Sequence, residues 1–303
     1  MKHYKFNKFY KPFTAISAVL VIISLLLLGI KGLNLGIDFK GGTLIELRAI
    51  DKQINISSLR NSFSKMNLGD VAIKNFGNDK DFLIKFEKKG DNKSLIQNIK
   101  KKLNAYLGTG YEIRRVENVG PKVSNELLKG GLIAIAASLG AMLFYIWIRF
   151  EWQFAVGAIS ALIHDVILTI GIFSLLQIKF DLAIIAAILT IVGYSLNDTV
   201  VVFDRVRENL RKFKKRSLIE VMNLSINETM SRTVMTSVTT LLALISLFVL
   251  GGDVIRGFVF AMIWGVVVGT YSSIFIASAI LLWTGVKRDW TKPNAEAGTQ
   301  VPQ

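Results

Sequence analysis

IVGYSLNDTVVVFDRVR, residues 191–207, places polar and acidic side chains inside a run that is otherwise apolar enough for lipid. Ser195, Asn197 and Asp198 lie within it, before the run ends in charged residues. A carboxylate at membrane depth costs about 3 kcal/mol on insertion scales. The stretch therefore indicates a membrane helix in which Asp198 has a partner, a cavity or a function.

The composition of the chain favours a membrane protein with one soluble portion. Of its 303 residues, 51% are hydrophobic, and the mean hydropathy is +0.45. A net charge of +15 is compatible with nucleic-acid binding, but much of the excess lies in short segments beside apolar runs. Membrane topology explains such a distribution better, so we expect no nucleic-acid partner. The chain has no cysteine, which excludes disulfides and thiol chemistry and leaves the compartment open.

Six apolar runs are long enough to span a membrane, and they divide the chain. They cover residues 13–30, 127–148, 152–176, 182–203, 233–250 and 258–283. The first is read as an anchor rather than a signal peptide, because no small-residue cleavage site follows it. The predicted domains are a cytoplasmic basic tail 1–12, a transmembrane helix 13–30, a periplasmic domain 31–128, transmembrane helices 2–6 within 129–283 with a basic cytoplasmic loop 204–232, and a cytoplasmic tail 284–303.

The soluble portion shows the pattern of a ferredoxin-like domain. We predict strands at 43–48, 71–76, 82–87 and 111–116, and helices at 57–66 and 91–107. A turn at residues 77–80 should join the second and third strands as a hairpin. The order βαββαβ is that of a split, ferredoxin-like sandwich. It contains no catalytic constellation, and the chain lacks nucleotide and hydrolase motifs, so energy for work must come from an ion gradient or a partner.

Loop charge predicts the orientation of the chain. With six spans, both termini and residues 149–151 and 204–232 share one side, and the lysine and arginine clusters lie there. That side should be cytoplasmic, which puts residues 31–128 in the periplasm of a bacterium. Residues 219–230 carry an apolar stripe suited to a helix that lies on the membrane surface.

Two readings of Asp198 follow from its position. It precedes Asp204 by about 9 Å along a helix, so it lies in the headgroup region if the helix ends at Asp204. No breaker follows Arg207, and a longer helix would set Asp198 deeper. Arg232 stands at the inner end of the fifth span, which makes an Asp198–Arg232 contact feasible. Thr236 and Thr239 share the face of Arg232 and serve either a water path or helix packing.

His164 and Asp165 lie about 18 Å or more into the third span. Adjacent residues on a helix point about 100° apart, so one face should not present both. A satisfied buried histidine is the simpler reading, whereas a buried aspartate needs compensation for its charge. Metal binding is not expected, because His3 is the only other histidine. A ladder of small residues in the sixth span indicates close helix contact. It comprises Ala261, Gly265, Gly269, Ser273 and Ala277.

Five motifs, taken in order, resemble a known family. They are GIDFKGGT at residues 36–43, VGPKVSNELL at 119–128, IHDV at 163–166, GYSLNDTVVVFDRVREN at 193–209 and SRT at 231–233. The set is similar to the SecF members of the SecD/SecF family, within the RND superfamily. The fold expected is an α-helical integral membrane protein, an RND-type half with six transmembrane helices and a periplasmic α+β ferredoxin-like domain after the first helix.

The resemblance implies an accessory subunit of the Sec preprotein translocase in the bacterial inner membrane, and no enzyme. It implies SecD as partner, with the SecYEG channel, YajC, YidC, the translocating preprotein and the lipid bilayer as further contacts. Its energy source is the proton gradient, without a cofactor, and its proton-handling pair falls on Asp198 and Arg232. Supporting polar residues would be Ser195, Asn197, Thr236, Thr239, His164 and Asp165. Movement would be coupled to the domain through Gly36, Asp38, Gly41, Gly42, Gly120 and Pro121.

Two alternatives remain at this point. An RND-type proton-driven exporter half-subunit for lipids or small molecules predicts a hydrophobic substrate groove. A passive translocon scaffold predicts that neutralising Asp198 is harmless.

Overall fold

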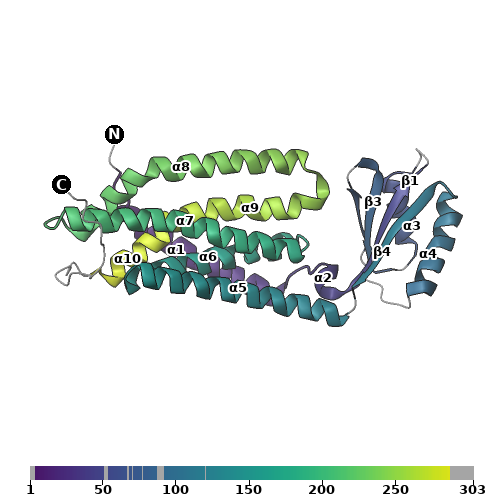
Figure 1. Ribbon diagram of the computed structural model, residues 1–303, viewed down its shortest axis with the longest axis horizontal. Helices are drawn as coiled ribbons and strands as arrows, with labels where there is room; N and C mark the ends of the chain where they lie inside the picture. The colour runs from purple at the N-terminus through teal and green to yellow at the C-terminus, as the bar shows by residue number, and fades with distance from the viewer. Residues whose placement is uncertain are drawn as a thin grey trace, which may run out of the picture.

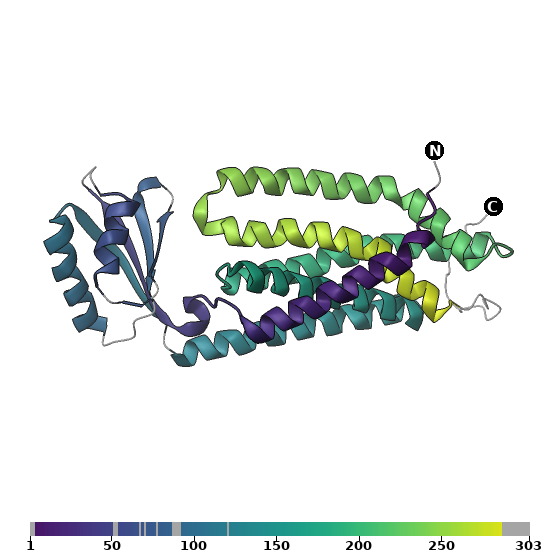
Figure 2. The same ribbon diagram turned by 180° about the vertical axis from the view of Figure 1, so that it is seen from behind.

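The computed structural model describes residues 4–50, 54–66, 68–69, 71–76, 78–86, 92–119 and 121–286. A long helical bundle carries one small sheet-containing domain at one end (Figures 1 and 2). Helix α1 begins and helix α10 ends at the opposite end of the bundle (Figure 1). The chain therefore crosses the bundle an even number of times, with the domain inserted after the first crossing.

Six helical segments among the described residues are long and apolar enough to cross a membrane, so the predicted number of spans is confirmed. The last one changes from α-helix to a short π-helical stretch, η1, and back. The helices are α1 (Asn7–Ile30), α5 (Pro121–Arg149), α6 (Trp152–Leu176), α7 (Leu182–Lys212), α8 (Leu218–Leu250), α9 (Gly252–Ser272), η1 (Ser273–Ala277) and α10 (Ser278–Thr284).

The predicted basic loop at residues 204–232 is a helical hairpin instead. Helix α7 continues to Lys212, because nothing in the sequence breaks it after Arg207. Helix α8 starts at a capping box between Ser217 and Glu220 and runs without interruption to Leu250. The surface helix predicted for residues 219–230 is therefore wrong: its apolar stripe packs against the bundle, with Met222 and Ile226 buried.

The soluble domain has the predicted order of elements. Its strands form one antiparallel sheet in the order β2-β3-β1-β4, and the three pairings are antiparallel. The strands are β1 (Gly42–Ala49), β2 (Val71–Phe76), β3 (Asn78–Phe86) and β4 (Tyr111–Val119), and the helices are α3 (Ile56–Ser64) and α4 (Asn92–Leu107). Strand β3 begins four residues earlier than predicted, and Gly77 and Glu87 of the predicted hairpin lie outside the described residues. A further short helix, α2 (Ile37–Lys40), precedes β1.

The helices α7 and α9 approach each other through glycines, as the small-residue ladder predicts. A Cβ atom on Gly265 would lie 2.3 Å from Ile191 Cγ1, and one on Gly269 would lie 3.0 Å from Ser195 Cβ. A side chain at Gly265 would therefore displace Ile191, and one at Gly269 would be tightly crowded by Ser195. The close approach brings the serines that follow Gly269 next to the acidic stretch of α7.

Candidate functional site

Asp198 occupies the middle of α7. About 24 Å of helix separates it from Leu182 and about 21 Å from Lys212, and only 6% of the residue is exposed. Helix α7 therefore continues past Asp204, as the deeper of the two positions considered for this carboxylate requires. Thr233 Oγ1 on α8 donates a hydrogen bond to its Oδ1 (2.9 Å), and Ser273 Oγ donates to its Oδ2 (3.2 Å). Each carboxylate oxygen thus has one hydroxyl partner, from a different helix.

Arg232 is not in direct contact with Asp198, so the predicted ion pair is not found within the described residues. The guanidinium is exposed on the outside of α8 and acts on Asp198 only as a more distant charge. Its neighbour Thr233 points inward instead, because successive residues are turned by about 100° around a helix. Thr236 and Thr239 also face outward and donate to carbonyls of their own helix.

A second carboxylate, Asp165 on α6, is fully buried beside the first. Ser195 Oγ and Ser272 Oγ donate to its Oδ2 at 2.6 and 2.7 Å. His164 Nδ1 lies 2.9 Å from its Oδ1, so the two adjacent side chains converge although the sequence predicts separate faces. The Nε2 atom of His164 is buried without a hydrogen-bond partner in the part of the chain described here. Two hydroxyl donors and one imidazole nitrogen surround Asp165, compared with two hydroxyl donors for Asp198.

Residues of α7 and of the last span link the two carboxylates through hydrogen bonds. Ser195 and Asp198 lie one turn apart on α7, while the adjacent residues Ser272 and Ser273 each contact a different carboxylate. The π-helical stretch η1 begins at Ser273. Such stretches are rare and are frequent at functional sites. Hydroxyls both donate and accept, so they can remain bonded to a carboxylate that gains or loses a proton.

Within the described residues, no group of three or more histidine and acidic side chains could hold a metal ion. The groups that meet at Asp165 and Asp198 are hydroxyls, one imidazole and carboxylates. This arrangement suits proton binding and release more than metal coordination. Asn197 does not belong to it, because its side chain is exposed on the outer face of α7.

The soluble domain is fastened to the start of α7 by the segment that follows α1. Gly36 N–H donates to Phe180 O, and Phe180 N–H donates to Asn34 O, both at 2.8 Å. The Asp38 carboxylate accepts from the first amide of α7, Leu182 N–H (3.1 Å). A Cβ on Gly36 would lie 3.1 Å from the Cβ of Asp181, which explains the glycine.

The domain begins after Gly41 and ends before Pro121. Gly41 has a φ of 79° and leads from α2 into β1, which begins at Gly42. At the other end Pro121 is the first residue of α5, as suits a residue without an amide hydrogen. Gly120 lies outside the described residues.

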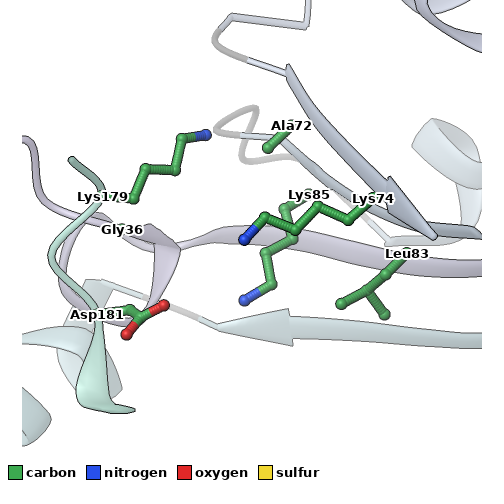
Figure 3. A pocket seen from close by; sticks show the side chains of 7 residues that line it. All are labelled: Gly36, Ala72, Lys74, Leu83, Lys85, Lys179 and Asp181. Carbon is green, nitrogen blue, oxygen red and sulfur yellow. The ribbon is translucent and has the colours of Figure 1, made fainter. Parts of the chain in front are cut away.

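Figure 3 shows how the domain meets the α6–α7 turn. Lys74 from β2 and Lys85 from β3 extend toward Asp181, and with Lys179 they line a small cavity of about 60 Å³. Burial raises the pKa of the Asp181 carboxyl, and the charge of Asp38 raises it further, whereas both strand lysines oppose the rise. The junction therefore contains a carboxylate whose charged form is unfavourable in the folded state.

We expect Asp181→Asn to raise the melting temperature of the purified chain at pH 7 to 8, by about 2–4 °C. A raised carboxyl pKa means that the folded state loses stability as the pH rises through it, and asparagine removes this effect. Asparagine also still caps the amide of Ile184, which Asp181 contacts at 3.3 Å. The difference should vanish below about pH 4, where aspartate is protonated in both states. A matched Asp204→Asn change should not raise the melting temperature, and a lower value for Asp181→Asn at neutral pH would contradict the expectation.

The comparisons with known proteins agree with this architecture. The family model "Protein export membrane protein SecD/SecF, C-terminal" matches residues 99–287, and "SecD/SecF GG Motif" matches residues 26–49. A protein translocase subunit SecF of Cereibacter sphaeroides is 49% identical over 278 residues, which are 89% of this chain and 86% of the relative. The SecF of Rickettsia rickettsii is 44% identical over 92% of this chain and 91% of its own length.

The chain belongs to the SecD/SecF family.

Solved structures of SecD/SecF proteins extend the match to three dimensions. The crystal structure of SecDF from Thermus thermophilus, described as a translocon-associated membrane protein, has a TM-score of 0.78 and 37% identity over 93% of this chain. Another SecDF structure, in a super-membrane-facing form, has a TM-score of 0.73 and 36% identity over 94% of the chain. The chain spans only 39% of the length of either SecDF protein. It is a multi-pass membrane protein that corresponds to one part of SecDF.

The SecD/SecF matches cover both the junction between the soluble domain and the bundle and the pair of buried carboxylates. The GG-motif model covers the junction at Gly36, and the C-terminal model covers both carboxylates. Sequence reasoning missed Thr233, Ser272 and Ser273 as their partners. A signal was present for the first, because hydroxyl residues recur four apart on the buried face of α8. They are Thr229, Thr233 and Ser237.

Proposed function

We propose that the chain is the SecF-type subunit of a Sec preprotein translocase. Together with SecD it uses the proton-motive force to promote translocation and release of proteins on the periplasmic side. The observation that carries this proposal is the buried Asp198, held by two hydroxyls between three helices of a SecD/SecF bundle. A carboxylate at that depth, without an ion pair, is suited to exchange of a proton.

A polar face on α7 and α8 supports SecD as the partner. Asn197, Arg232, Thr236 and Thr239 are exposed on this single chain, at positions within membrane-spanning helices. Amide and guanidinium groups are unfavourable against lipid, so a second polypeptide is expected to cover them. The portion of SecDF that this chain lacks is the natural candidate. Arg232 would then lie between the two halves, close enough to act on Asp198.

The charge distribution supports a bacterial inner-membrane location with both termini in the cytoplasm and residues 31–128 in the periplasm. Basic residues gather at the end of the bundle opposite the soluble domain, where Arg149 ends α5 and Arg211 lies near the end of α7. Positive loops favour the cytoplasmic side. SecYEG, YajC and YidC are further partners that the family resemblance implies.

The proposed mechanism follows from the contacts of Asp198. Protonation removes the negative charge to which Thr233 and Ser273 donate, so the hydrogen bonds that hold α8 and the last span to α7 become weaker. The start of α7 is bonded to the segment that enters the soluble domain, so a shift of α7 is transmitted there. The membrane potential supplies about 2.3 kcal/mol per charge per 100 mV, enough to bias a two-state movement.

The proposal is tested with inverted membrane vesicles that lack the chain and vesicles to which it has been restored together with SecD. We expect restoration to stimulate precursor export, and a protonophore to remove that stimulation while export driven by ATP continues. Stimulation that survives the protonophore would contradict proton coupling and favour a passive scaffold. A stimulation that needs no SecD would contradict the partner.

A further inference from the structure

A cavity lies at the end of the bundle opposite the soluble domain, outside the carboxylate site. Its volume is about 460 Å³, and it opens between the last residue of α5 and the final turns of α7. Four cationic side chains and two acidic ones line it. They are Arg149, Arg207, Arg211, Lys212, Asp204 and Glu208.

The acidic residues around this cavity are already engaged with arginines. Asp204 lies 3.4 Å from Arg149, and Glu208 lies 2.7 Å from Arg205, which is outside the lining. Glu151 adjoins the cavity, and Arg207 and Arg211 oppose the rise that burial causes in its pKa. The exposed residues 214–216 that follow α7 are all basic and add further positive charge. Among the described residues that line the cavity, basic side chains therefore outnumber acidic ones.

The guanidinium groups are held in place rather than free to separate. Arg207 donates to the carbonyl oxygen of Arg149 (3.2 Å), and both guanidiniums lie over the ring of Phe150, at 5.3 and 5.9 Å. Arg211 is four residues beyond Arg207 on the same helix face, a spacing at which like charges repel. An anion bound between these groups would relieve the repulsion, and arginine binds phosphate through two parallel hydrogen bonds.

The end of α5, which supplies Arg149 to the cavity, also carries exposed apolar side chains. Trp147 and Ile148 are 61% and 69% exposed, immediately before Arg149. Tryptophan is enriched where headgroups meet acyl chains, and basic pockets between membrane helices on the cytoplasmic side bind anionic headgroups. An anionic phospholipid combines a phosphate with acyl chains and so fits both the basic cavity and the exposed apolar side chains.

We propose that this cavity binds an anionic glycerophospholipid, with its phosphodiester between Arg207 and Arg211 and its acyl chains along Trp147 and Ile148. The site is separate from Asp198 and does not depend on the role of the chain in export. A bound lipid would tie the ends of α5 and α7 together, since each helix supplies part of the lining.

The test is a titration of the purified full chain with short-chain phosphatidylglycerol, in which the melting temperature of the protein is measured at each lipid concentration. Phosphatidylcholine, inorganic phosphate and glycerol phosphate serve as comparison ligands. We expect stabilisation by phosphatidylglycerol that weakens as salt is added, and little by the other three. The double variant Arg207→Gln, Arg211→Gln should weaken phosphatidylglycerol binding about ten-fold or more. Its matched control, Lys214→Gln with Lys215→Gln, removes the same charge outside the cavity and should change binding less than about two-fold.

Each other outcome overturns the proposal. Equal weakening in both double variants would mean diffuse attraction to a basic surface. Equal binding of inorganic phosphate would mean a simple anion site, and equal stabilisation by phosphatidylcholine would mean no headgroup selectivity. If the arginine double variant does not fold, Arg211→Gln is judged by the same criteria, against Lys215→Gln.

Discussion

Asp198→Asn is expected to abolish the protonophore-sensitive stimulation of export in restored vesicles and to leave the chain assembled with its partner. This is the largest functional effect that we expect from a single substitution. Asparagine has nearly the shape of aspartate and still accepts from Thr233 through its carbonyl oxygen, so the packing of three helices is kept. It cannot change charge, so the step that responds to the proton gradient is lost.

The matched control for this variant is Asp204→Asn. It is the same chemical change on the same helix, about 9 Å away, at a side chain that is 47% exposed and lies near Arg149. We expect it to leave stimulation within about two-fold of the wild type, because exposed ion pairs contribute little. Full stimulation by Asp198→Asn, with the complex recovered in normal amount, would contradict the proposed role of Asp198. Equal loss in both variants would point to a general effect of charge on α7.

The helices and the soluble domain were predictable because their signals are local. Strand 71–76 has the predicted bounds, and six apolar runs became six membrane helices. Sheet order followed from the βαββαβ sequence of elements. Helix ends were less predictable, because the charge of residues 204–212 favours a loop whereas the lack of a breaker favours a longer helix. The structure has the longer helix, since charged residues continue a helix when no glycine or proline interrupts it.

The partners of the carboxylates depend on tertiary packing and were harder to predict. The motif SRT offers Arg232 and Thr233 as neighbours, and the rotation of α8 about its own axis decides which of them meets Asp198. Charge complementarity favours the arginine, but packing turns the threonine inward. Ser272 and Ser273 were hidden for a similar reason. The sequence predicts a regular helix here and does not indicate the π-helical stretch that begins at Ser273. It also does not indicate that the adjacent residues Ser272 and Ser273 contact two different carboxylates.

Asp165→Leu should have the largest effect on folding, because we infer that Asp165 anchors the bundle, whereas Asp198 is the proposed proton-exchanging group. The leucine leaves the hydroxyl of Ser195 without its acceptor and His164 Nδ1 without its carboxylate partner in a buried site. Ser272 also loses the carboxylate and keeps only the carbonyl oxygen of Gly269 as an acceptor. Each buried group without a partner costs about 1–3 kcal/mol. Together these costs are a large part of the 5–15 kcal/mol by which a typical domain is stable. We expect little monodisperse protein after extraction, whereas Asp165→Asn, which keeps an acceptor, should be recovered in substantial amount.

A rescue experiment separates lost hydrogen bonds from lost volume. Removing both hydroxyl donors together with the carboxylate, in Asp165→Leu with Ser195→Ala and Ser272→Ala, leaves fewer unpaired groups than Asp165→Leu alone. The triple variant should therefore be recovered in larger amount than the single variant, although it carries more substitutions. If recovery falls further, the bonds to Asp165 are not what stabilises the site.

The Asp165→Asn protein then distinguishes an anchor from a proton carrier. If Asp165 is an anchor, protonophore-sensitive export per assembled complex should stay intact in this variant. Loss of that export would place Asp165 beside Asp198 in proton transfer.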